Sequence, residues 1–169
     1  MPDTPFTFRL VTPQRLLLEA RAVSLQAPGS EGYLGILANH APLITPLRPG
    51  RLEVRDEHGA LRTYAVSGGF LEVSMNRATV LADSAEAADA IDRPRAEASH
   101  HRAETRLGDG GAGGARPQTQ SIDRARAQRA LERAKNRLAI TGADAGIDRR
   151  APSTGADGAV SVRDREQRP

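Results

Sequence analysis

The chain has 169 residues, enough for one ordinary domain or for a domain with a small appendage. It contains no cysteine, which excludes disulfides and thiolate metal sites, and no stretch approaches the roughly eighteen apolar residues of a membrane-spanning helix. The net charge is only +3, and the N-terminal residues lack the basic-then-apolar pattern of a secretory signal. Any membrane association is therefore expected to be indirect, through a partner.

The N-terminal half carries the pattern of short β-strands separated by turns. Phe6, Phe8 and Leu10 alternate with polar residues, which is the period of two typical of a half-buried strand. Similar short apolar runs then recur between glycine and proline turn signals. The predicted strands span residues 6–10, 16–19, 22–27, 33–37, 43–47, 52–54, 61–66, 69–75 and 78–82. Their close spacing predicts an antiparallel β-sandwich of about ten short strands rather than an alternating strand–helix fold.

The C-terminal half changes to alanine and arginine, a composition typical of helices. Asp92 is a good N-cap for a helix that reaches residue 107, and Asp123 for a second helix that ends near residue 140. Between them, residues 108–121 contain GDGGAGG and a proline, which predicts a flexible linker. The expected organisation is a β-sandwich domain, an antiparallel two-helix hairpin and a disordered tail, at residues 1–84, 85–140 and 141–169.

The two predicted helices share a short internal repeat, since IDRPRA at 91–96 matches IDRARA at 122–127. Each helix pairs an alanine stripe with a row of arginines at helical spacing. Closing the hairpin would gather these guanidinium groups, whose planar donor fork suits phosphate oxygens. Because alanine buries little area, the hairpin is predicted to be a two-state element. The alternative is a solvated arginine face supported by i,i+4 pairs with Glu97, Glu104 and Glu132.

Two stretches of the strand region are rich in glycine and proline: EGYLGILANHAPLITPLRPG at 31–50 and SGGFLEV at 67–73. Such residues serve where a backbone turns or approaches another backbone closely. Their order, followed by TVLAD at 79–83, closely resembles the epsilon subunit of the F-type ATP synthase. The resemblance covers residues 4–140 and implies an N-terminal β-sandwich followed by a C-terminal helical hairpin.

The resemblance also implies partners. In that family the subunit turns with the central stalk, held between the gamma subunit and the ring of membrane c subunits. It implies a non-catalytic subunit, peripheral at the cytoplasmic face of a bacterial plasma membrane, with no nucleic-acid partner, no metal and no required cofactor. Contact with the c-ring or gamma would involve Ser30, Glu31, Tyr33, His40, Ala41, Pro42 and Leu43. The simpler interpretation, that Gly32 and Gly35 shape a sandwich edge, is compatible with that contact.

ATP-binding bacterial members of the family hold the nucleotide with an I/L-D-x-x-R-A motif and further arginines on both helices. Ile91, Asp92, Arg95 and Ala96 match that motif, whereas Pro94 and the long glycine linker depart from the family. The resemblance implies ATP as a regulatory ligand of Glu86, Ile91, Asp92, Arg95, Ala96, Arg102, Arg133 and Arg137. With the hairpin open, the alpha and beta subunits would meet Arg126, Arg129 and Arg133, which would resist hydrolytic rotation.

The other function considered is an arginine-rich nucleic-acid-binding module, in which the same arginines contact phosphates. Few aromatics are present for stacking and there is no recognisable reader motif. A small-molecule enzyme would need a convergent acid–base pair. The SGG serine, the GDGGAGG run and the adjacent histidines lack the neighbours of a nucleophile, a P-loop or a metal site.

Overall fold

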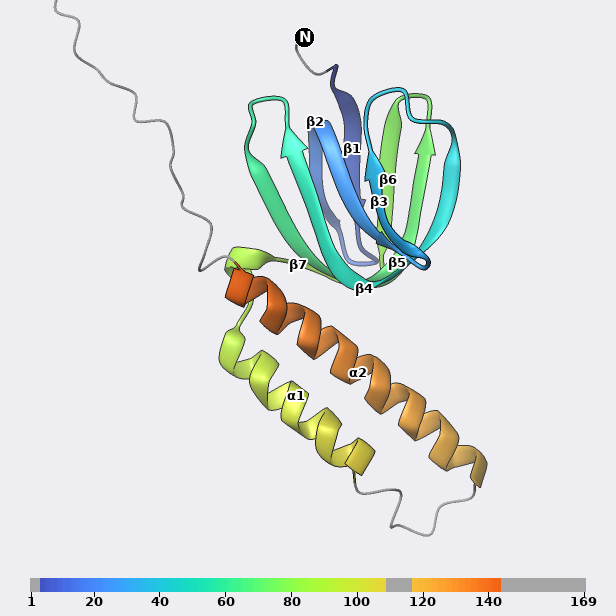
Figure 1. Ribbon diagram of the computed structural model, residues 1–169, viewed down its shortest axis with the longest axis vertical. Helices are drawn as coiled ribbons and strands as arrows, with labels where there is room; N and C mark the ends of the chain where they lie inside the picture. The colour runs from blue at the N-terminus through green and yellow to red at the C-terminus, as the bar shows by residue number, and fades with distance from the viewer. Residues whose placement is uncertain (1–3, 109–116, 144–169) are drawn as a thin grey trace, which may run out of the picture.

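The computed structural model describes residues 4–108 and 117–143, with side chains at 4–108 and 124–141 (Figure 1). The strands form one seven-stranded sheet. They are β1 (Phe6–Val11), β2 (Leu16–Gly29), β3 (Gly32–Ile36), β4 (Leu43–Asp56), β5 (Leu61–Ser74), β6 (Arg77–Ala82) and β7 (Ala85–Ala87). All pairings are antiparallel except that of β1 with β6. Because β1 pairs with both β6 and β2, the strands β1-β6-β5-β4-β2 close into a circuit around the core.

The strand count is lower than the expected ten or so, because three strands are long. β2, β4 and β5 each contain 14 residues, and β4 and β5 run through glycines and prolines that suggested turns. These residues bend the strands instead of ending them. At Gly69, for example, φ is +124° and a Cβ would collide with the carbonyl oxygen of Leu81 on β6, so β5 continues there only with glycine.

The predicted alternation in the first strand is confirmed. Phe6, Phe8 and Leu10 are buried at no more than 1% exposure, and the residues between them are half-buried. They join a core supplied by every strand from β1 to β6. Burying each such large apolar side chain contributes about 1.5–3 kcal/mol, which is what makes the sandwich a firm body.

Two helices follow a short 3₁₀ turn at Ala88–Ala90: α1 (Arg93–Gly108) and α2 (Pro117–Ala143). The predicted cap of α1 is confirmed, since the Arg95 N–H donates to Asp92 Oδ1 at 2.9 Å. α2 begins at Pro117, inside the stretch predicted as a linker, so Asp123 does not start it. Proline suits a first helical turn because its missing N–H would have no partner there. α2 also continues three residues past Ile140, and the rest of the predicted linker and tail lies outside the described residues.

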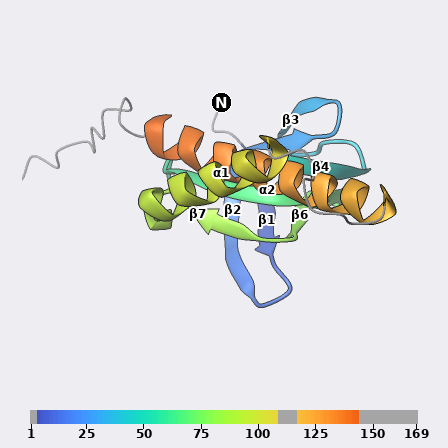
Figure 2. The same ribbon diagram turned by 90° about the horizontal axis from the view of Figure 1, so that it is seen from below.

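The helices lie antiparallel, and α2 rests on the sandwich where β4 and β5 bend (Figures 1 and 2). Their contact is made by small residues, as the alanine stripes predicted. Ala96 and Ala103 of α1 and Ala127 and Ala134 of α2 are at most 4% exposed. Because these methyl groups bury little area, each helix depends on the other and on the sandwich for stability.

Candidate functional site

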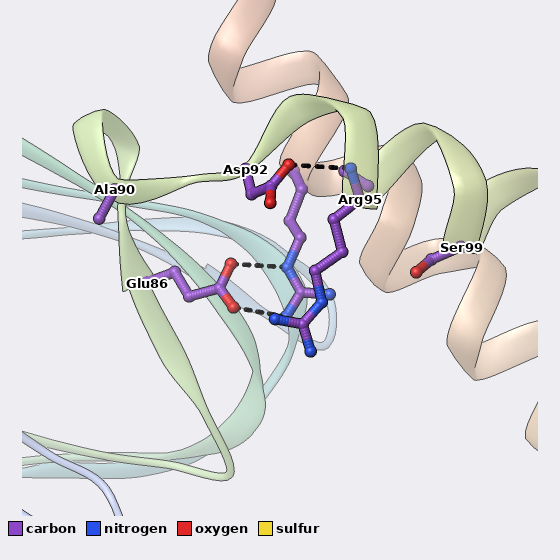
Figure 3. Close-up of a pocket in the computed structure, with 7 residues that line it drawn as sticks. Glu86, Ala90, Asp92, Arg95 and Ser99 are labelled. Atoms are coloured by element: carbon purple, nitrogen blue, oxygen red, sulfur yellow. Dashed lines mark hydrogen bonds and ion pairs between the residues drawn. The ribbon is translucent and has the colours of Figure 1, made fainter.

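A polar pocket of about 190 Å³ lies where β7, the start of α1 and the end of α2 meet (Figure 3). Each element contributes a charged group. Glu86 comes from β7, Asp92 from the N-cap of α1, Arg95 from its first turn, and Arg137 from α2. The lining is completed by Ala90, Ala96 and Ser99. The pocket therefore exists only while the sandwich and both helices are assembled.

A bidentate ion pair spans the pocket wall. Arg137 Nε donates to Glu86 Oε2 at 2.7 Å, and Arg137 Nη2 donates to Glu86 Oε1 at 2.9 Å. The fork-to-fork geometry fixes the angle between the two groups as well as their distance. Both side chains are partly exposed, at 27% and 41%, so solvent screening limits the contribution of the pair to stability. Its main effect is to hold α2 against β7.

Arg95 and Asp92 form the other side of the pocket. One oxygen of Asp92 accepts the N–H that begins α1, which fixes this carboxylate at the pocket. The Arg95 side chain runs from α1 toward Glu86 (Figure 3). Two carboxylates and two guanidinium groups thus surround one polar space. Such a set suits a ligand that offers both anionic oxygens to arginine and hydrogen-bond donors to carboxylate.

Five of the eight residues predicted for a nucleotide line this pocket: Glu86, Asp92, Arg95, Ala96 and Arg137. The other three do not. Ile91 follows the 3₁₀ turn, Arg102 donates to Ser99 Oγ at 2.9 Å on the exposed side of α1, and Arg133 is half-buried one turn before Arg137. Sequence reasoning missed Ala90 and Ser99 as lining residues. Ser99 could have been found, because it lies four residues after Arg95 on the same helix face.

Part of α1 fits the alternative prediction of a solvated helix face supported by i,i+4 pairs. Arg93 pairs with Glu97 at 3.0 Å, and His100 lies 3.3 Å from Glu104, both at i,i+4 spacing. On α2, Arg126 and Arg129 lie on the exposed side, while Arg133 is half-buried. The arginines therefore divide into a pocket set and a surface set.

The residues predicted to meet the c-ring or gamma fall into two groups at opposite ends of β3 (Figure 1). At the β2–β3 turn, a shallow hollow of about 220 Å³ is lined by the first group: Ser30, Glu31, Tyr33 and Leu43. The second group, His40, Ala41 and Pro42, is exposed in the turn between β3 and β4. That turn is ordered by its own bonds, since the His40 N–H donates to the Leu37 carbonyl at 3.2 Å.

An exposed apolar row crosses the outside of the sandwich, which sequence reasoning also missed. Pro46 on β4, Phe70 on β5 and Leu81 on β6 are cross-strand neighbours. Phe70 is 55% and Leu81 49% exposed, and Ile44 beside them is 73% exposed. The available signal was a large apolar residue at an outward position of an alternating strand. Contiguous exposed apolar surface of this kind marks a protein contact.

No helix within the described ranges is long and apolar enough to cross a bilayer.

The two parts of the chain match two domain families of one class of protein. Residues 5–88 match the family "ATP synthase, Delta/Epsilon chain, beta-sandwich domain", and residues 89–142 match "ATP synthase, Delta/Epsilon chain, long alpha-helix domain". The ATP synthase epsilon chain of Moorella thermoacetica is 48% identical over 98 residues, which are 58% of this chain and 73% of that one. That of Pelotomaculum thermopropionicum is 49% identical over 107 residues, 63% and 79% of the two chains.

Solved structures share the fold. A chain of the Euglena gracilis mitochondrial ATP synthase (OSCP/F1/c-ring) aligns with a TM-score of 0.68 at 22% identity, over 80% of this chain and 81% of that one. A chain of the Tetrahymena thermophila mitochondrial ATP synthase (central stalk/c-ring) aligns at 0.53 and 17% identity, over 80% and 95%. The chain belongs to the ATP synthase epsilon chain family. Membership decides between the two functions considered from the sequence, in favour of the ATP synthase subunit.

Proposed function

We propose that the chain works as a central-stalk subunit that couples gamma to the c-ring and catalyses no reaction itself. The proposal is supported by epsilon family membership and, above all, by the exposed apolar row on a closed sandwich. A body that transmits torque must resist shear, and a closed strand circuit with one core meets that need. The Euglena and Tetrahymena complexes that share the fold both include the c-ring, which agrees with this role.

In this arrangement the row formed by Pro46, Phe70 and Leu81 packs on gamma, and the exposed turn with His40 meets the polar loops of the c-ring. The subunit is then peripheral at the cytoplasmic face of the bacterial plasma membrane and attached only through its partners. An affinity-tagged chain expressed in its own cell should co-purify with gamma from the membrane fraction. Recovery of the tagged chain free of gamma, in a cell that assembles the synthase, would refute the stalk role.

We further propose that the pocket binds ATP as a regulatory ligand. Bound ATP would keep the hairpin closed on the sandwich and leave rotation free. Without ATP the hairpin would open, and Arg126, Arg129 and Arg133 would reach acidic surfaces of the alpha and beta subunits and resist hydrolysis. ATP at ten times its dissociation constant would favour the closed state by about 1.4 kcal/mol, enough to shift a balanced switch roughly tenfold.

Titration of the purified chain with ATP tests this role. The Arg95→Ala change should raise the dissociation constant roughly tenfold to a hundredfold, since a hydrogen bond to a charged group is worth about 1.5–3 kcal/mol. Arg93→Ala is the matched control, because Arg93 begins the same helix but pairs with Glu97 outside the pocket. Absence of saturable binding at millimolar ATP, or equal binding by Arg95→Ala and the native chain, would remove the sensor role and leave the stalk role intact.

A further inference from the structure

One side chain joins α2 to the backbone of the sandwich. The amide nitrogen of Asn136 donates to the carbonyl oxygen of Gly50 at 2.8 Å and to that of Val66 at 3.2 Å. Gly50 and Val66 are directly paired across β4 and β5, so their carbonyls form a two-acceptor site at the bend of the sheet. The NH₂ group of a side-chain amide has two N–H donors, one for each of these carbonyls.

The two carbonyls lie where β2 packs closely against β4. The ladder between β2 and β4 shifts register between Gln26 and Gly29, and it contains no pair at Gly50. Pro28 of β2 packs against Gly50 so closely that a Cβ there would collide with the proline ring. Asn136 gives the Gly50 and Val66 carbonyls a donor from outside the sheet, at 2.8 and 3.2 Å.

The sandwich core is built without α2. Among the described residues, none from α2 belongs to the sandwich core. α2 also contacts β4, β5 and the 3₁₀ turn, and the partly exposed Arg137–Glu86 pair joins it to β7. Asn136 and Arg137 are consecutive, so one turn of α2 carries both the bond to the sheet and the wall of the pocket.

We propose that Asn136 is the latch that sets the docked position of the hairpin and thereby assembles the pocket. Asn136 does not line the pocket, so it acts as a positioning residue for Arg137 and, through the hairpin, for Arg95. Docking and ligand binding are then reciprocally linked. The inference rests on the proposed mobility of the hairpin, but it requires neither that the ligand be ATP nor that the hairpin inhibit rotation.

The distance between two spin labels on the full chain reports docking directly. The chain has no cysteine, so labels at His58→Cys on the sandwich and Arg124→Cys on α2, both exposed positions, are the only ones introduced. Asn136→Asp replaces both donors with a carboxylate facing two carbonyl oxygens. Without ligand, it should raise the undocked-to-docked ratio roughly tenfold or more, the order expected for losing two hydrogen bonds and adding repulsion. Asn136→Leu removes the donors alone and should have a smaller effect in the same direction.

Gln128→Glu is the matched control, because it adds the same negative charge to an exposed position of α2. It should keep the native distance distribution. A native distribution in Asn136→Asp would overturn the latch. So would a native distribution in Asn136→Leu, since that result would assign Asn136 a packing role. Retained gamma binding and β-sheet circular dichroism would show that the sandwich remains folded in each variant.

Nucleotide affinity separates this inference from the proposed function. If the chain binds ATP, Asn136→Asp should weaken binding in proportion to the lost docked fraction, while Gln128→Glu should not. Undocking by Asn136→Asp in a chain that binds no ATP would support the latch and remove the sensor. Native docking and native ATP affinity in Asn136→Asp would remove the latch and leave the sensor.

Discussion

At the scale of single residues, several side chains owe their roles to neighbours that are distant in sequence. Glu86 forms an ion pair with Arg137 on α2. Tyr64 on β5 is 8% exposed and lies opposite Ala87 of β7. Burial raises the pKa of the Tyr64 phenol above its usual value of 10.0, with Asp89 adding to the shift and Arg62 opposing it. The neutral phenol is therefore the form that the fold prefers.

This preference predicts an alkaline loss of stability. A group whose pKa is raised on folding contributes stability below its unfolded pKa, here near 10.0, and that stability is lost as the pH rises through the folded value. The free energy of unfolding measured by urea denaturation should therefore decline above about pH 10, and Tyr64→Phe should reduce the decline. Tyr33→Phe, at the exposed second tyrosine, should leave the decline in place. An identical alkaline profile in Tyr64→Phe and the native chain would contradict this account.

At the scale of elements, the helical hairpin differs from the sandwich in what holds it together. The sandwich has phenylalanine and leucine in its core, whereas the helices meet through alanine methyl groups. Close approach of the two helix backbones is thus possible only while these positions stay small. The hairpin can then be loosened without affecting the strands.

Overpacking the helix contact should show this independence. Ala134→Leu inserts a large side chain at a position with 0% exposure and should destabilise the hairpin by about 1–3 kcal/mol. Helical circular dichroism should melt at a lower temperature, while the near-ultraviolet signal of the sandwich tyrosines should not shift. Ala139→Leu, on the exposed side of α2, is the control. A coincident shift of both signals would mean that the hairpin and sandwich unfold as one unit.

At the scale of the whole molecule, the apolar row and the pocket lie on different elements. The row lies across β4, β5 and β6, and the pocket joins β7 to the two helices. A partner held by the row therefore need not block the pocket. The molecule can stay attached to its stalk partner while the hairpin docks or undocks.

A charge placed in the apolar row should weaken gamma binding without changing ATP binding. Phe70→Asp puts a carboxylate where a partner would bury an aromatic ring, and it should lower recovery of gamma at least tenfold, since interface anchors of this kind are worth about 2 kcal/mol or more. ATP affinity should be unchanged. Leu61→Asp, at another exposed apolar residue of β5, is the control. Undiminished gamma recovery with Phe70→Asp would place the partner on another face.

Features set by local chemistry could be predicted from the sequence, whereas those set by distant partners could not. The alternation at Phe6, Phe8 and Leu10 and the cap at Asp92 need only neighbouring residues. The length of β5 depends on how Gly69 meets Leu81 across the sheet, so the sequence could not decide whether the glycine pair marks a turn or a close approach of two strands. The same holds for the pocket. Arg137 lines it and Arg102 does not, and this difference depends on how α2 docks on the sandwich.

Pro28 has a consequence beyond its own strand. Its ring packs so closely on Gly50 that a Cβ there would collide with it, and the carbonyl of that same glycine accepts from Asn136 of α2. A residue of β2 thus supports the part of β4 to which α2 is bonded. A substitution in β2 can therefore change the docked position of α2 without altering any residue of the helix.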